Sequence, residues 1–471
     1  MTAAFGPFGR LLRRSRHAGA APLANRAKAG AERRGRSRGQ RFAALESHET
    51  ARALPAAALV AALVLSACGG KPPAPAGEAA APPTIRVATF NAYLNRPAQG
   101  GLIASLSAPD DPQAKAVAEI IQRAAPDLLL LQEFDYDAEG RALALFQENY
   151  LGVSQNGAAP IAYPYLFLGA TNTGVHSGHD LDRDGAVTSE PGSRAYGGDA
   201  FGYGDFPGQY GMVLLSKYPI DEAAVRTFRT FLWKDMPHAM LPDDPATPAQ
   251  ADWYSPDALA VFRLSSKSHW DAPVIIGGAR LHVLASHPTP PVFDGEEDRN
   301  GRRNHDEIRF WADYISPGAG GYIYDDESGR GGLAAGERFV ILGDMNADPM
   351  DGDGVPGAAA QLLDHPAVSA SPAPESNGGA AQAKIQGGAN LVHGTPAATD
   401  TADFGDDVEK GGAGNLRLDY VLPSKRGVAV KGGGVFWPAP DEEGYALVGP
   451  GFPVVSSDHR LVWIDIQLTD E

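Results

Sequence analysis

Runs of apolar residues predict a series of strands from residue 84 onward. Residues 84–90 (TIRVATF) alternate between polar and apolar positions, as in a strand with one buried face. Residues 127–133 (DLLLLQE) are apolar up to a final Gln-Glu pair, which is typical of a strand buried on both faces. Shorter apolar runs predict further strands at 211–216, 281–286, 338–342, 416–422 and 461–466.

Helical periodicity appears between some of these strands. Residues 112–125 carry apolar side chains at helical spacing, and Pro126 ends the predicted helix. Residues 304–315 form a second predicted helix. The mixture of strands and helices predicts an α/β or α+β fold. Two long insertions rich in Gly and Asp, at about 135–208 and 347–414, have no clear periodicity.

The amino end of the chain predicts an export signal. Residues 54–67 form an apolar run that follows an Arg-rich segment and is shorter than the about 20 residues that span a bilayer. Cys68 follows directly, in a Leu-Ser-Ala-Cys sequence that resembles the lipobox of bacterial lipoproteins. The resemblance implies a signal peptide over residues 1–67, acylation of Cys68 and a lipid anchor in the bacterial cell envelope. An ordinary signal peptide and a buried helix are the alternatives. Residues 68–83 would be a Pro/Ala/Gly-rich tether.

Composition and charge exclude several classes of protein. With 43% apolar residues among 471, the chain can form a large core, and its single Cys permits no intramolecular disulfide. The first 67 residues hold 12 of the 40 basic and 3 of the 57 acidic residues, which leaves 28 basic and 54 acidic residues for the rest. A body this acidic repels polyanions, so non-specific binding of duplex DNA is unfavourable.

Polar residues cluster at the ends of the predicted strands. Acids and amides of this kind are hard oxygen ligands that suit Mg²⁺ or Mn²⁺. Two histidines in similar positions could move protons or stabilise phosphate charge near neutral pH. The residues in question are Asn91, Glu133, Asp344, Asn346 and Asp419, together with His287 and His459.

Seven short motifs, taken together, resemble the endonuclease/exonuclease/phosphatase family. That family includes deoxyribonuclease-I-like nucleases, apurinic endonucleases, sphingomyelinases and inositol polyphosphate phosphatases. The resemblance implies an α+β fold, a four-layer α/β/β/α sandwich, in one domain over residues 84–471, with the active site where strand ends of both sheets meet. The motifs, in the family's order, are TFN at 89–91, LQE at 131–133, YGMVLLSKYP at 210–219, SH at 286–287, GDMNADP at 343–349, RLDYVL at 417–422 and SDHR at 457–460.

The same resemblance implies a metal site. Asn91 and Glu133 would lie at a catalytic Mg²⁺ or Mn²⁺ ion, with Glu133 as the principal ligand, and Asp458 matches a family position near the metal. The ion would neutralise the charge that develops during in-line attack on phosphorus.

The remaining motif residues would carry the proton chemistry and hold the phosphate. Asp344 would orient or deprotonate the attacking water, and Asn346 would hold a phosphate oxygen or that water. His459 would stabilise the phosphoryl charge or act as base, with its orientation fixed by Asp419. His287 would contact the scissile phosphate or protonate the leaving group. The sequence leaves open which group is the base.

The implied function is that of a secreted, metal-dependent phosphodiesterase or nuclease, acting as a monomer. Its substrate would be a nucleic acid, a lipid headgroup or a small organophosphate. A phosphomonoesterase, a sphingomyelinase-like lipid phosphodiesterase and a non-catalytic surface binding protein are the alternatives. Asn346-Ala-Asp and Asn415-Leu-Arg-Leu-Asp419 replace motifs of the family's inositol phosphatases, which argues against that branch.

An acidic segment in the first insertion is a separate candidate for a structural Ca²⁺ ion. Asp180, Asp182 and Asp184, followed by Gly185 and the apolar Val187, match the first half of a calcium-binding loop. Val187 would then pin the loop to the core. A proline stands where an EF-hand has its bidentate Glu, so a solvated acidic turn is the alternative.

Overall fold

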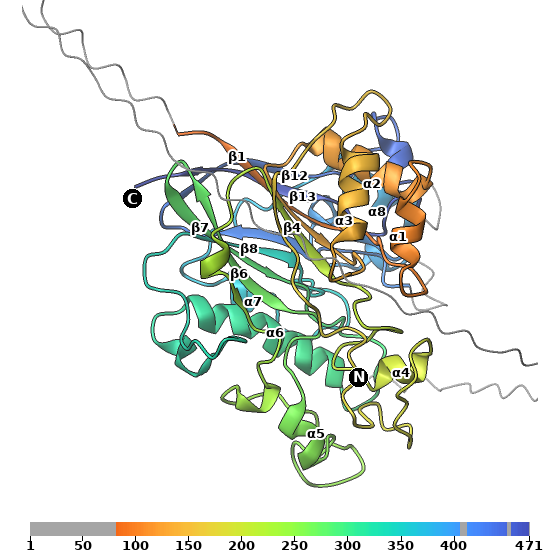
Figure 1. Ribbon diagram of the computed structural model, residues 1–471, viewed down its shortest axis with the longest axis vertical. Coiled ribbons are helices and arrows are strands. Elements are labelled where there is room, and N and C mark those ends of the chain that lie inside the picture. Colours follow the sequence, from red (N-terminus) through yellow and green to blue (C-terminus); the bar gives the residue numbers. More distant parts are fainter. Residues whose placement is uncertain (1–81, 406–411, 450–453, 471) are drawn as a thin grey trace, which may run out of the picture. The chain divides into compact units, whose positions relative to one another are not determined.

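The computed structural model describes residues 82–405, 412–449 and 454–470 (Figure 1). Cys68, the predicted signal peptide and all but the last two residues of the predicted tether lie outside the described residues. Within the described ranges, no helix combines the length and the apolar character needed to cross a bilayer.

The first sheet contains the amino-terminal and carboxy-terminal strands side by side. It has six strands in the order β12-β13-β1-β2-β4-β3, in which β1 and β2 run parallel while β13 pairs antiparallel with β1. The strands are β1 Ile85–Asn91, β2 Leu128–Gln132, β3 Tyr165–Phe167, β4 Met212–Ser216, β12 Val428–Val435 and β13 Val462–Leu468.

The second sheet has five strands in the order β11-β8-β7-β6-β5. Strands β7 and β8 are parallel, and β11 is antiparallel to β8. Its strands are β5 Arg226–Thr227, β6 His269–Ile276, β7 Ala279–Ser286, β8 Phe339–Asp344 and β11 Asp419–Pro423; a separate two-stranded pair consists of β9 Ala402–Asp403 and β10 Asn415–Leu416.

Helices cover the outer face of each sheet (Figure 1). The longest, α6, lies against the second sheet, and α2 packs into the core of the first. The α-helices are α1 Gly101–Leu106, α2 Pro112–Ala124, α3 Arg141–Phe146, α4 Arg194–Gly198, α5 Pro256–Val261, α6 Arg299–Ile315, α7 Ala360–Leu363 and α8 Asn377–Gln386. A π-helical turn follows α3 at Gln147–Leu151, and 3₁₀ turns occur at Glu222–Ala224, Trp233–Asp235, Ala319–Tyr322, Gly388–Leu391, Ala397–Thr399 and Tyr445–Leu447.

The layering follows from side chains that alternate across each strand. In β8, Val340 and Leu342 belong to the core between the two sheets, whereas Phe339 and Ile341 belong to the core beneath α6. Successive strand residues point to opposite faces, so one strand supplies both cores. Trp311 of α6 is fully buried in the second core. The result is the expected α+β sandwich of two sheets between helical layers.

Strand direction brings the motif residues to one edge. Asn91 ends β1, and Glu133 follows the parallel β2. Asp344 ends β8, where the antiparallel β11 begins with Asp419 directly opposite it. His459 precedes β13, which enters the first sheet antiparallel to β1. The carboxyl ends of the parallel strands therefore meet the amino ends of their antiparallel neighbours.

The sequence predicted most elements and missed some. The strands expected near 84–90, 127–133, 211–216, 281–286, 338–342 and 461–466 are present, as are both helices, although α6 begins five residues before the predicted 304. The predicted strand 416–422 is two strands, β10 and β11, which pair with different partners, β9 and β8. The aperiodic insertions contain short helices, including α3 and α4 in the first and α7 and α8 in the second.

Candidate active site

One carboxylate oxygen, Asp344 Oδ2, lies at the centre of the strand-end residues. Asn91 Nδ2 donates a hydrogen bond to it at 3.1 Å. His287 Nε2 lies at 3.4 Å and His459 Nε2 at 3.6 Å from the same oxygen. All four side chains are buried. Three sequence-distant segments thus converge on Asp344, at the strand ends where the family resemblance placed the site.

The next acid, Glu133, is joined to this centre through an amide. Asn91 Nδ2 donates to Glu133 Oε1 at 3.2 Å as well as to Asp344, so one amide group bridges two acids. Asn95 Nδ2 donates to the other oxygen at 3.0 Å. Burial and the nearby charge of Asp458 raise the pKa of Glu133 to about 7. Glu133 also has a φ of 55°, a left-handed conformation that side chains seldom adopt outside functional sites.

Glu133, Asn91 and Asp458 fit a divalent metal ion. They offer hard oxygen atoms, and repulsion from the Asp458 carboxylate adds to burial in raising the pKa of Glu133. No Lys, Arg or His nitrogen lies within 4.0 Å of either carboxylate among the residues that the structure describes. A cation held between them would relieve the repulsion. The residues present therefore suit the predicted Mg²⁺ or Mn²⁺ ion.

A second tight group, Asp344, Asp419 and His459, is better explained as a hydrogen-bond relay. Its potential ligand atoms lie within 4.8 Å of one another. However, His459 Nδ1 is already 2.8 Å from Asp419 Oδ2, which fixes the ring with Nε2 toward Asp344. This is the carboxylate–imidazole pairing that the sequence predicted.

Thr401, from the second insertion, supports the relay and was not predicted. Its hydroxyl donates to Asp419 Oδ2 at 2.8 Å and accepts the backbone N–H groups of Leu418 and Asp419. Asp403 and Arg460 tie this segment to the chain around His459 through backbone hydrogen bonds. The insertion therefore completes the site, although its sequence showed no regular pattern.

The two imidazoles have opposite electrostatic environments. Burial alone would lower the pKa of His459, but the charges of Asp419 and Asp344 outweigh it, and the pKa lies well above the usual value. Burial, Lys267 and His459 hold the pKa of His287 well below the usual value. The surroundings of His459 therefore favour its cationic form, and those of His287 favour its neutral form. The roles that the family resemblance implied for His287, contact with the scissile phosphate or protonation of the leaving group, stay predictions.

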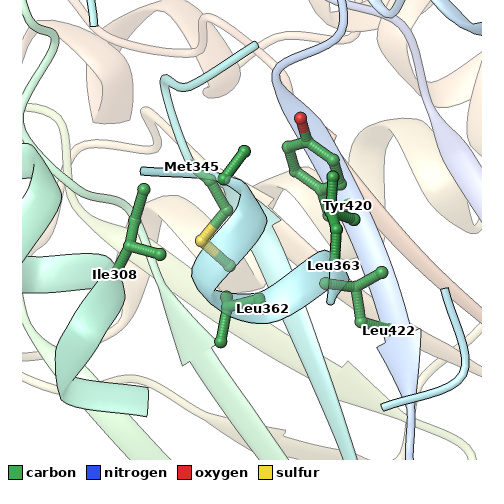
Figure 2. Close-up of a pocket in the computed structure, with 7 residues that line it drawn as sticks. Ile308, Met345, Leu362, Leu363, Tyr420 and Leu422 are labelled. Atoms are coloured by element: carbon green, nitrogen blue, oxygen red, sulfur yellow. The ribbon is translucent and has the colours of Figure 1, made fainter. Parts of the chain in front are cut away.

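Core side chains and hydrogen bonds fix the position of the loop that carries Asp344 and Asn346. Met345 points into a small apolar pocket lined by α6, α7 and β11 residues, which Figure 2 shows. Asn304 Nδ2 donates to the Met345 carbonyl at 2.8 Å. Gly343, with a φ of 152°, lies so close to the Ser286 carbonyl that a Cβ would overlap it. Asn346 Nδ2 donates to the Pro288 carbonyl at 3.1 Å. The apolar pocket thus fixes the loop and contains none of the predicted site residues.

The acidic segment of the first insertion differs in detail from its prediction. Carboxylate oxygens of Asp180, Asp182 and Asp199 lie within 4.8 Å of one another, whereas Asp184 lies outside this group and accepts the Ala186 N–H. Val187 is 52% exposed, so the expectation that it pins the loop was wrong. The neighbouring Leu181 is the buried residue instead, because the turn places it against the core. Calcium binding here stays a prediction.

Solved structures of low sequence identity resemble the chain. An endonuclease/exonuclease/phosphatase from Beutenbergia cavernae is 16% identical over 82% of this chain and 72% of its own, with a TM-score of 0.42. Sphingomyelinase C from Streptomyces griseocarneus is 15% identical over 81% and 99%, with a TM-score of 0.38. A mutant of beta toxin from Staphylococcus aureus with bound magnesium ions is 14% identical over 82% and 100%, with a TM-score of 0.38.

A comparison with functionally curated protein sequences gave no match. A protein-family model, in contrast, matches most of the chain. A sequence model of the Endonuclease/Exonuclease/phosphatase family matches residues 88–459, from within β1 to His459. This span contains all the predicted residues of the strand-end site. The chain therefore belongs to the Endonuclease/Exonuclease/phosphatase family and is an enzyme that hydrolyses phosphate esters.

Proposed function

We propose that the chain is an exported, metal-dependent phosphodiesterase. The observation that carries the proposal is the convergence on Asp344, where one carboxylate oxygen lies 3.1–3.6 Å from Asn91, His287 and His459. This arrangement places an acceptor for a water proton beside donors for phosphate oxygens. It fits hydrolysis of a phosphate ester by in-line attack.

The metal side of the site would consist of Glu133, Asn91 and Asp458. A bound Mg²⁺ or Mn²⁺ ion would supply positive charge to the phosphate oxygens. Asn91 has a second task, because its amide holds the carboxylates of Glu133 and Asp344 in a fixed relation. Asn95 restrains the far oxygen of Glu133. These hydrogen bonds organise the site before the ion binds.

The proton side would use Asp344 and His459. Asp344 is the acceptor for the proton of the attacking water. His459 lies between two carboxylates, Asp419 at Nδ1 and Asp344 at Nε2, so the imidazolium form is stabilised. As a cation it stabilises charge on the phosphoryl group and can give its Nε2 proton to the leaving oxygen. His287 and Asn346 would hold phosphate oxygens through hydrogen bonds.

The substrate class is best tested with a panel that separates the alternatives. The full-length chain is purified and assayed with Mg²⁺, Mn²⁺ or a chelator against bis-nitrophenyl phosphate, nitrophenyl phosphate, plasmid DNA, RNA and sphingomyelin. We expect metal-dependent turnover of a diester above that of the monoester. Preferential hydrolysis of nitrophenyl phosphate would replace the diesterase proposal by a phosphomonoesterase. No turnover of any substrate would favour the binding-protein alternative.

Export and anchoring form a separate part of the proposal. The apolar run before Cys68 and the lipobox-like sequence support acylation of that residue. We expect Cys68→Ser to release or mislocalise the protein. Mass spectrometry of the protein from its native membrane is the direct test. An unmodified Cys68, or a mature chain that starts beyond it, would contradict the lipid anchor.

A further inference from the structure

Lys267 is a buried cation beside the site that has no acidic partner. It directly precedes Ser268 and β6, and only 6% of its surface is exposed. Its ammonium donates one long hydrogen bond, 3.4 Å, to the Pro288 carbonyl. Among the residues that the structure describes, no carboxylate oxygen lies within 4.0 Å of Nζ. A lysine is seldom buried in this way without a paired anion.

The hydrogen bond places the ammonium next to the predicted phosphate-binding residues. Pro288 follows His287 directly, and its carbonyl also accepts from Asn346 Nδ2 at 3.1 Å. Lys267 and Asn346 therefore share one acceptor. Burial lowers the pKa of Lys267, and the charges of three acids oppose this effect, Glu307 first, then Glu133 and Asp344. Two of these three belong to the site.

Glu307, the acid whose charge acts most strongly on Lys267, does not serve as an ion-pair partner. Its carboxylate accepts the backbone N–H groups of Ser266 and Thr289, each at 2.6 Å. Those two bonds clamp the segment before β6, which carries Lys267, to the loop that follows His287. Glu307 thus sets the position of the lysine, while the ammonium keeps two N–H groups for another acceptor. Burying an incompletely paired charge costs free energy, which favours a role for it with a bound anion.

We propose that Lys267 binds a non-bridging oxygen of the substrate phosphate. This inference rests on the proposed function and adds a residue to it. The ammonium keeps its proton, and no bond forms or breaks at Nζ. Its charge would offset the negative charge that builds on the phosphate oxygens as the water attacks. Asn346, fixed through the shared carbonyl, would donate to a neighbouring oxygen.

The test compares two lysines that differ in their surroundings. Lys267→Met removes the charge and keeps an unbranched side chain, and Lys267→Arg keeps a charge. Lys217→Met is the control, because Lys217 is partly exposed and pairs with Asp127 at 3.0 Å, away from the predicted site residues. We expect Lys267→Met to lower kcat/KM on the best diester about 100-fold or more, and Lys217→Met to leave it within about twofold of the wild type.

Thermal unfolding with inorganic phosphate gives a readout that a structural role would not move. In the presence of Mg²⁺, phosphate should raise the Tm of the wild type and of Lys217→Met, since it binds the native state. The Lys267→Met variant should lose this rise, while its Tm without phosphate should equal or exceed that of the wild type. A Lys267→Met variant that keeps both the activity and the phosphate response would overturn the inference.

Two further cases need their own test: a Lys267→Met variant that does not fold, and a wild type without activity. If Lys267→Met does not fold, ¹⁵N-lysine NMR of the wild type replaces it: the Nζ signal that Lys267→Arg removes must shift on addition of phosphate, and an unmoved signal refutes the inference. If the wild type neither hydrolyses a phosphate ester nor responds to phosphate, the proposed function itself fails. Wild-type activity with an indifferent Lys267→Met variant would refute only the role of Lys267.

Discussion

Two acidic groups in this molecule bring three potential ligand side chains within 4.8 Å, yet they are built differently. The group Asp344, Asp419 and His459 lies at the strand ends, and its side chains are at most 6% exposed. The group Asp180, Asp182 and Asp199 lies in the first insertion, where Asp180 and Asp182 are partly exposed. We call the first group the buried group and the second group the loop group.

The difference is one of charge compensation. In the buried group an imidazole stands between the two acids, so the group contains its own cation. In the loop group, within the part of the chain that the structure describes, compensation comes from backbone N–H groups alone, two of which bind Asp199. Arg183 lies within the loop but pairs with Asp244 instead. A compensated buried group can act on a proton, whereas three carboxylates without a cation favour an added ion.

The largest expected effect concerns the cation of the buried group. We expect His459→Asn to lower kcat about 10²–10⁴-fold, since it removes the group that stabilises phosphoryl charge. Steady-state kinetics on the best diester measure the loss.

The molecule provides a matched control for this substitution. His282 Nδ1 lies 2.7 Å from Asp271 Oδ1, so it forms a second His–Asp pair within the second sheet, away from the strand-end residues. His282→Asn should leave kcat within about threefold of the wild type once the fold is verified by circular dichroism. An equal loss in both variants would mean that stability, rather than the chemistry of His459, explains the result.

A smaller effect is expected at the support of the relay. Thr401→Val keeps the shape of the side chain but removes the hydroxyl that binds Asp419. Since Thr401 acts on His459 only through Asp419, kcat should fall about tenfold, less than in His459→Asn. The pH profile of kcat should shift as well, because the hydrogen bond helps to keep Asp419 ionised. Unchanged kcat and pH profile would limit Thr401 to holding the backbone.

The site was predictable where sequence order follows strand ends. Asn91, Glu133, Asp344 and Asp419 each lie at or directly beside a strand end, and the parallel and antiparallel pairings bring those ends together. His459 joins them for the same reason. A residue of this kind is recognisable because an apolar run leads directly to it or away from it.

Other parts could not be predicted because their partners are distant and their local pattern is misleading. Strand β6 contains Asp271 and Pro273, which usually argue against a buried strand. Its neighbour β5 has only two residues and does not reach Pro273, and Asp271 is paired with His282. Thr401 and Lys267 lie in segments that read as polar loops. Only the fold shows that both are buried at the site.

Asp400 is a buried acid outside both groups. It is 2% exposed, and its carboxylate accepts no hydrogen bond among the described residues. Burial and the charges of Asp348 and Asp351 raise its pKa to about 8, from 3.8. The folded state thus holds this proton more tightly than the unfolded state. Its contribution to stability is fully present below about pH 4 and is lost as the pH rises toward 8.

Asp400→Asn should therefore stabilise the protein at high pH. Since the amide carries no charge, the difference in unfolding free energy between variant and wild type should grow from pH 5 to pH 9. We expect about 1–3 kcal/mol at pH 9, the range for a buried polar group without a partner. Urea unfolding at several pH values measures it. A difference that does not change with pH would mean that Asp400 titrates as an ordinary exposed acid.

The last expected effect concerns the stability of the loop group and leaves catalysis unchanged, and it decides whether that group is an ion site or a solvated turn. Asp182 fits beside Asp199 only because residue 198 is a glycine. A Cβ at Gly198 would overlap the Asp182 carboxylate. A bound Ca²⁺ ion would offset the repulsion within the group and stabilise the native state by about 2.7 kcal/mol at a hundredfold excess over Kd.

We expect a chelator to lower Tm by a few degrees, and Ca²⁺ to restore it better than Mg²⁺. The double variant Asp180→Asn/Asp182→Asn should lose the Ca²⁺ response and keep its diesterase activity with Mg²⁺. Asp184→Asn is the matched control, since Asp184 lies in the same turn but outside the group. If the double variant, the control and the wild type all respond alike to Ca²⁺, the loop group binds no ion, and charge compensation by solvent alone is sufficient there.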